Sequence, residues 1–71
     1  MACSTFEAGR LDKLYRKYVS ARGDFDVRRL STAVKREAHA AERGTIHVTR
    51  GLLRELRADR AEVGRLARRC R

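Results

Sequence analysis

The chain has 71 residues, and its 18 lysines and arginines against 9 acidic residues give a formal net charge of +9. This length allows one domain at most, and so short a chain is marginally stable unless a partner stabilises its folded state. No apolar run approaches the roughly 20 residues that span a bilayer, which excludes a transmembrane helix. We also expect no secretory signal, because residues 1–20 lack a continuous apolar region.

Arginine supplies most of the positive charge. Its planar guanidinium suits bidentate recognition of carboxylates and phosphates. We therefore expect an acidic partner, and charge alone leaves three kinds open: a nucleic acid, an anionic membrane surface or an acidic protein.

The first helix is predicted over about residues 5–21. Ser4 and Glu7 have the spacing of a capping box at its start, and Gly23 supplies its expected stop. Apolar residues recur at the i, i+3, i+4, i+7 spacing of one helix face. This stripe contains Leu11, Leu14, Tyr15, Tyr18 and Val19.

The second helix is predicted over about residues 27–43, with Asp26 as its cap and Gly44 as its end. Its apolar stripe consists mostly of small residues, which would let a neighbouring helix approach closely. The members of this stripe are Val27, Leu30, Ala33, Val34, Ala38 and Ala41.

The third helix is predicted over about residues 50–69, with Thr49 as its cap. Residues 45–48 alternate like a strand but have nothing to pair with, so we expect a linker there. The stripe of this helix contains Leu52, Leu53, Leu56, Val63, Leu66, Ala67 and Cys70, and we expect Asp59 and Arg60 to face solvent. These patterns predict an all-α fold, a three-helix up-down-up bundle that forms a single domain over residues 1–71.

Residues with reactive side chains are few. Cys3 and Cys70 stand at opposite ends of the sequence, and we expect a reduced, inert pair without a neighbouring base. His39 and His47 belong to different elements, and neither has the partner spacing of a metal site. The sequence contains no catalytic acid pair, Gly-rich phosphate loop or nucleophile elbow, so we expect neither an enzyme nor a metal protein.

The arginine-rich third helix allows an interaction with nucleic acid. It carries no Asn or Gln, so it would bind phosphates with little reading of bases. One functional hypothesis is therefore a small Arg-rich helical protein that binds nucleic acid non-specifically. Two other interpretations stay open: a structural protein that fills a groove in a ribosome or membrane complex, and a helix bundle whose arginines merely form a solvated surface.

The tripeptide Leu14-Tyr15-Arg16 resembles the motif of the LYR family of small mitochondrial adaptor proteins. Leu11 stands three positions before the motif, and residues 17–22 continue an apolar and basic helix as in the family. A second basic helix includes residues 34–38, and the third carries the similar leucine pattern of residues 52–56. One difference is that the family usually has a phenylalanine near the end of the second helix, where this chain has none.

The resemblance implies a non-enzymatic adaptor that binds mitochondrial acyl carrier protein, an acidic partner that carries a 4′-phosphopantetheine arm. It implies an accessory subunit or assembly factor of a larger mitochondrial complex, either a respiratory complex, the iron–sulfur machinery or the mitoribosome. The implied location is the matrix or the matrix side of the inner membrane. The protein would need no cofactor of its own, because the partner's acyl group would enter the helix core.

Two groups of residues follow from the resemblance. Those implied to line the path of the acyl and phosphopantetheine groups are Leu11, Leu14, Tyr15 and Tyr18. Those implied to face the carrier protein are Arg16, Lys17, Lys35 and Arg36.

Overall fold

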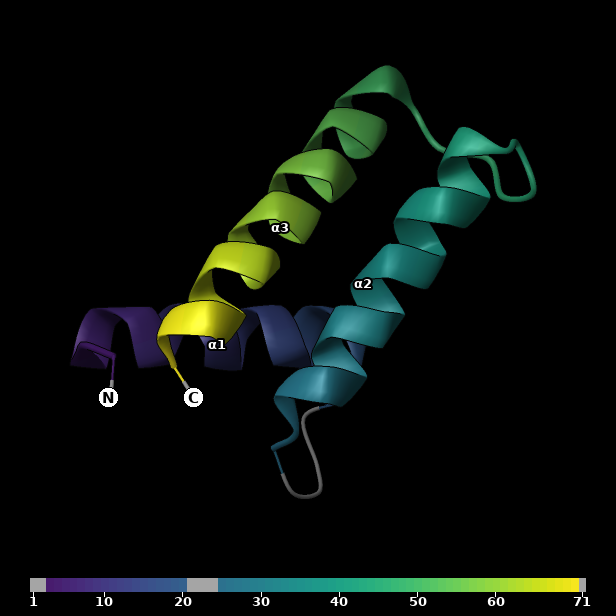
Figure 1. Cartoon of the computed structure of the whole chain (residues 1–71). Coiled ribbons are helices and arrows are strands. Elements are labelled where there is room, and N and C mark those ends of the chain that lie inside the picture. The colour runs from purple at the N-terminus through teal and green to yellow at the C-terminus, as the bar shows by residue number, and fades with distance from the viewer. Residues whose placement is uncertain (1–2, 21–24, 71) are drawn as a thin grey trace.

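The computed structural model describes residues 3–20 and 25–70. Within these residues the chain forms three α-helices and no strand: α1 (Thr5–Tyr18), α2 (Val27–Glu42) and α3 (Arg50–Arg69). The predicted all-α three-helix bundle is confirmed (Figure 1). Residues 45–48 form an irregular connection between α2 and α3, as expected for a linker.

The predicted caps of all three helices are present. The hydroxyl of Ser4 accepts a hydrogen bond from the Glu7 amide at 3.1 Å, and the Glu7 carboxylate accepts one from the Ser4 amide at 3.0 Å. Asp26 and Thr49 cap α2 and α3 through bonds from amides in their first turns. These side chains satisfy amides that the helix leaves without a partner.

The predicted helix ends are partly correct. Gly44 follows α2 with a φ of 75°, in the left-handed region that glycine adopts without steric cost. However, α1 ends at Tyr18 and not near residue 21. The amides of Val19 and Ser20 both bond to the carbonyl of Tyr15, so the regular ladder stops there. Gly23, the predicted stop, lies outside the described residues.

Helices α2 and α3 form an antiparallel hairpin, and α1 lies across it (Figure 1). Ion pairs join Glu7 to Arg69, Arg10 to Glu62, and Lys17 to Glu55. Early positions of α1 therefore meet late positions of α3, so the two helices run in opposite senses where they cross. In an up-down-up order α1 and α3 would run in the same sense, so this part of the prediction is wrong, whereas the three-helix bundle itself is confirmed.

The core consists of two neighbouring clusters. The first joins all three helices and contains Leu11, Leu14, Tyr15, Leu30, Val34, Val63 and Leu66. The second lies between α2 and α3 and contains Ala38, Ala41 and Leu56. Burying each of the larger side chains contributes about 1.5–3 kcal/mol. Two alanines of the predicted stripe, Ala38 and Ala41, are thus buried between the hairpin helices.

Two residues of α3 do not lie where the sequence predicts. Leu52, assigned to the apolar stripe, lies in the first turn of α3 and is 49% exposed. Asp59, assigned to the solvent, is only 8% exposed. It stands three residues after Leu56 and four before Val63, so the helix period places it on the buried face. Arg60 is exposed as predicted.

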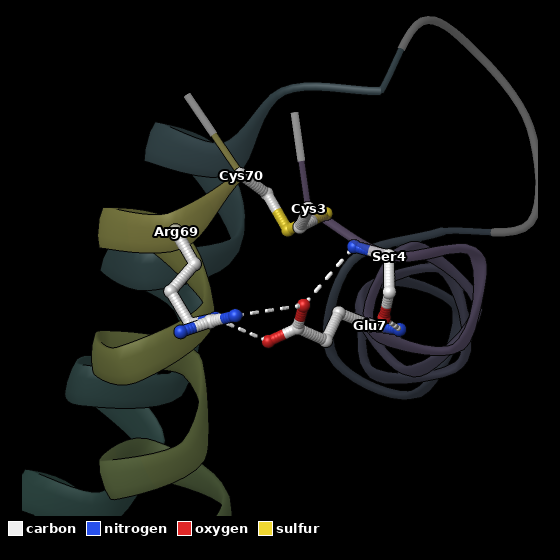
Figure 2. The surroundings of a disulfide bond; sticks show 5 residues. All are labelled: Cys3, Ser4, Glu7, Arg69 and Cys70. Carbon is white, nitrogen blue, oxygen red and sulfur yellow. Dashed lines mark hydrogen bonds and ion pairs between the residues drawn. A yellow bond between two sulfur atoms is a disulfide. The ribbon is translucent and has the colours of Figure 1, made fainter. Parts of the chain in front are cut away.

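The prediction of a reduced cysteine pair is wrong. Cys3 and Cys70 form a disulfide although 67 positions separate them in the sequence, and their Cα atoms lie 4.8 Å apart (Figure 2). The crossing of α1 brings the start of this helix to the end of α3. Closing so large a loop restricts the unfolded chain, and the loop-entropy model assigns this restriction about 4 kcal/mol.

Candidate anion-binding groove

An open groove of about 600 Å³ runs along the α2–α3 hairpin. Two residues of α2 and six of α3 line it. These residues are Lys35, Glu42, Arg57, Arg60, Ala61, Gly64, Arg65 and Arg68.

The sequence of α3 explains the shape of this groove. Arg57, Ala61, Gly64 and Arg68 are spaced by four, three and four residues, so they share one face of the helix. The two small residues therefore form a floor between two arginines. A Cβ built on Gly64 would meet no atom within 4 Å, which shows that the space above this floor is open.

The charge of the groove is strongly positive. Its lining holds five cations against one carboxylate, Glu42, which pairs with Arg57 at 3.2 Å. Among the described residues, no ion pair joins Lys35, Arg60 or Arg68 to an acidic side chain. These exposed cations are available to an external anion, and their summed field concentrates anions at the groove.

The arrangement matches a chain of phosphates better than a single small anion. A helix rises 1.5 Å per residue, so Arg57 and Arg68 lie about 16 Å apart along α3. That length corresponds to about five phosphates of one DNA strand at an axial spacing of about 3.4 Å. One guanidinium group can donate two parallel hydrogen bonds to the oxygens of a phosphate. The lining contains neither an aromatic side chain for stacking nor an amide for base recognition.

The residues implied to line an acyl path do come together. Leu11, Leu14 and Tyr15 are buried in the first core cluster, where Leu30 and Val34 of α2 pack with them. Tyr18 is half-buried beside both clusters. Their present contacts are those of an ordinary helix-bundle core.

The cations implied to face a carrier protein have three different surroundings. Arg16 pairs with Asp12 on its own helix at 3.1 Å, and Lys17 bonds to acidic residues of α3. Lys35 lines the groove, whereas Arg36 is exposed on α2 and does not line it. The structure therefore assigns one of the four, Lys35, to the anion-binding groove.

A second polar cluster joins α1 to α3 around Asp59. Lys17 donates hydrogen bonds to Asp59 at 2.7 Å and to Glu55 at 2.6 Å, and the Tyr18 hydroxyl donates to Asp59. Burial and the bond to Asp59 raise the pKa of Tyr18 above its usual 10.0. Burial opposes the charge of Lys17, but its bonds to Asp59 and Glu55 outweigh burial and raise its pKa. Since these groups satisfy one another inside the protein, we assign the cluster a structural role.

The sequence interpretation did not single out the arginines of the groove. The signal was present, since four arginines of α3 surround two small residues, Ala61 and Gly64, in the sequence. These arginines are Arg57, Arg60, Arg65 and Arg68. Sequence alone does not show that Lys35 of α2 lies along the same groove, because that depends on how the hairpin packs.

Other candidate sites receive no support. His39 and His47 are both exposed, and the part of the chain that the structure describes holds no cluster of three or more metal-binding side chains. In the same residues, no helix is both long and apolar enough to cross a membrane. No protein-family model, curated protein or solved structure matches this chain.

Proposed function

We propose that this protein binds nucleic acid non-specifically, through phosphates held in the groove between α2 and α3. The observation that carries the proposal is the set of five groove cations, of which only Arg57 is paired with an acidic residue of the described chain. Such contacts would bind the backbone of the nucleic acid without reading its sequence, because the lining offers no group suited to base edges.

The composition of the groove favours nucleic acid over the other acidic partners. Protein interfaces usually bury an apolar centre, and membrane-binding helices insert large apolar side chains. The groove lining offers only the methyl group of Ala61 and the bare backbone of Gly64 beside its charged side chains. Phosphate binding needs no apolar contact, since released counterions supply its driving force.

The adaptor function implied by the LYR resemblance stays a prediction, as does the mitochondrial location. The tripeptide also has an explanation in folding, because Leu14 and Tyr15 are core residues and Arg16 pairs with Asp12. A disulfide is typical of oxidising compartments, so Cys3–Cys70 adds no support for the matrix. Binding to acyl carrier protein is therefore the competing outcome in the experiments below.

The first test measures the affinity for a fluorescent duplex of about 20 base pairs at several salt concentrations. We expect the logarithm of the association constant to fall linearly with the logarithm of the salt concentration. The double variant Arg60→Glu/Arg68→Glu should bind more weakly and lose about two units of this slope. Several unrelated duplex sequences should bind alike.

The matched control is Arg16→Glu/Arg36→Glu, which makes the same change in charge outside the groove. It should lower the affinity much less. Equal losses in both variants would show that net charge alone drives binding and would overturn the assignment to the groove. An absence of salt-dependent binding by the unaltered protein would overturn the function itself.

A second test changes the shape of the groove without changing its charge. Gly64→Leu places a bulky side chain on the floor and should weaken duplex binding. Gly64→Ala should bind almost normally, because open space surrounds the added methyl group. If the leucine variant bound as tightly as the alanine variant, the floor of the groove would not be the contact surface.

A third experiment tests the competing adaptor function. It measures the affinity of the protein for acyl carrier proteins loaded with acyl chains of different lengths. Affinity that depends on acyl length, together with no affinity for the duplex, would support the adaptor and overturn the groove proposal. Arg16→Glu should then abolish carrier binding, whereas our proposal expects this variant to retain nearly full duplex binding.

A further inference from the structure

The disulfide joins two helix ends of opposite polarity (Figure 2). Cys3 directly precedes Ser4, the N-cap of α1, whereas Cys70 is the C-cap of α3. Both cysteines keep part of their surface exposed to solvent, although Cys70 also packs against the first core cluster. This surface lies outside the proposed phosphate groove, so the chemistry of the disulfide does not depend on nucleic-acid binding.

The two sulfur atoms therefore differ as leaving groups. The N-terminus of a helix carries partial positive charge and its C-terminus partial negative charge. A thiolate is stabilised at a helix N-terminus, and a more stable thiolate leaves faster in thiol–disulfide exchange. These effects favour Cys3 as the leaving sulfur and Cys70 as the sulfur that is attacked.

Nearby side chains leave this difference in place. Arg69 is the cation next to Cys70 in the described chain, and it pairs with Glu7 of α1 (Figure 2). The Glu7 carboxylate also accepts the Ser4 amide. The bond from the Ser4 amide, followed by the bond from Arg69, lowers the pKa of Glu7 against a smaller opposing effect of burial. Because Glu7 and Arg69 carry opposite charges and pair with each other, their effects on the two sulfurs oppose one another, and we base the expected difference on the helix ends.

We propose that Cys3–Cys70 is a thiol-exchange site at which glutathione-type thiolates attack Cys70. The incoming sulfur forms a bond to Sγ of Cys70 while the Sγ–Sγ bond breaks, and its electron pair stays on Sγ of Cys3 as a thiolate. A second thiolate then attacks the incoming sulfur. This attack releases Cys70 as a thiolate, and the two attacking thiols leave joined to each other as a small-molecule disulfide. The protein disulfide has then gained two electrons.

Opening this bond separates the ends of a loop that contains almost the whole chain. The Glu7–Arg69 and Arg10–Glu62 ion pairs and the packing of α1 then hold the first half of α1 against α3. The site therefore controls how firmly α1 is attached to the hairpin.

The test treats the oxidised protein with reduced glutathione, stops the reaction with acid and locates the mixed disulfide by peptide mass spectrometry. We expect the glutathione adduct on Cys70 to exceed that on Cys3 several-fold at early times. Equal amounts, an excess on Cys3, or no adduct on the folded protein would overturn the proposal.

The matched control repeats the reaction in denaturant. The arginines next to Cys70 in the sequence remain there, but the helix ends do not, so the preference for Cys70 should disappear or reverse. An unchanged preference would assign the selectivity to local sequence and overturn the helix-end explanation.

Single-cysteine variants supply an independent measurement. The Cys3 thiol of Cys70→Ser should react with a maleimide at lower pH than the Cys70 thiol of Cys3→Ser. Circular dichroism would establish that both variants are folded under these conditions, and hydrogen exchange would report the looser α1. If the two thiols had the same pH profile in folded protein, the assigned leaving group would be wrong.

Discussion

Lys17 of α1 donates a hydrogen bond across 2.7 Å to Asp59 of α3, the one buried charged residue among those that the structure describes. Tyr18 donates to the same carboxylate oxygen, and the ammonium group of Lys17 also lies 5.3 Å from the centre of the Tyr18 ring. Two consecutive residues of α1 thus bond to one side chain of the hairpin. This contact fixes the position at which α1 crosses α3.

Removing the Asp59 carboxylate should destabilise the protein strongly. Asp59→Ala leaves the Tyr18 hydroxyl without its acceptor and Lys17 without one of its two partners, so we expect the free energy of unfolding to fall by about 3 kcal/mol. Glu55→Gln, at the exposed partner of Lys17, should cost less than about 1 kcal/mol. Urea denaturation measures both, and equal effects would contradict a central role for Asp59.

The same cluster predicts a loss of stability at high pH. The pKa values of Tyr18 and Lys17 are both raised in the folded protein, above 10.0 and 10.5 respectively. A group whose pKa is raised on folding stabilises the protein fully at pH values below its pKa in the unfolded chain. This stabilisation is lost as the pH rises through the pKa of the group in the folded protein. Unfolding free energy should therefore decline above about pH 10.

Denaturation followed from about pH 8 to about pH 12 checks this prediction. The unfolding free energy of Tyr18→Phe should decline less steeply with pH, because only the titration of Lys17 then contributes to the decline. An identical decline in this variant would exclude Tyr18 as a source of the effect.

The disulfide should carry a large share of the total stability. Cys3→Ser/Cys70→Ser removes the loop constraint, and we expect the free energy of unfolding to fall by about 4 kcal/mol. A domain of this size has a total of roughly 4–10 kcal/mol. Thermal unfolding should show a drop in Tm of more than about 10 °C. Reducing agent should lower the Tm of the unaltered protein similarly and leave the variant unchanged.

Two glycines should respond oppositely to alanine. Gly9 lies inside α1 with open space around it, so Gly9→Ala should stabilise the protein by about 0.5–1 kcal/mol. Gly44 has a positive φ after α2, so Gly44→Ala should destabilise it by about 1 kcal/mol. Chemical denaturation of the two variants checks both signs, and a shared direction would contradict the assigned backbone conformations.

The sequence predicted the helices well, because their signals act locally. A cap such as Ser4, Asp26 or Thr49 bonds to an amide within three residues, and an apolar stripe repeats within two turns. Asp59 was expected to face solvent because its side chain is charged, and this expectation was wrong. Its position on the buried face of α3 was visible in the spacing from Leu56, but the groups that make its burial possible lie about 40 residues earlier.

The groove was predictable only in part. The hypothesis of phosphate binding came from the arginine content of the third helix and its lack of Asn and Gln, without naming individual arginines. The continuation of the groove to Lys35 required the packing of α2 against α3. The LYR tripeptide shows that a short motif alone does not identify a function. Ordinary core packing of an amphipathic helix produces the same sequence pattern.

The sequence by itself determined three capped helices, their apolar faces and the excess of arginine, because these depend on residues within a few positions of one another. The tertiary structure decided the Cys3–Cys70 bond, the burial of Asp59 and the line of cations along the hairpin. Each of these depends on side chains far apart in the chain, which meet only because α1 crosses the hairpin and α2 packs against α3.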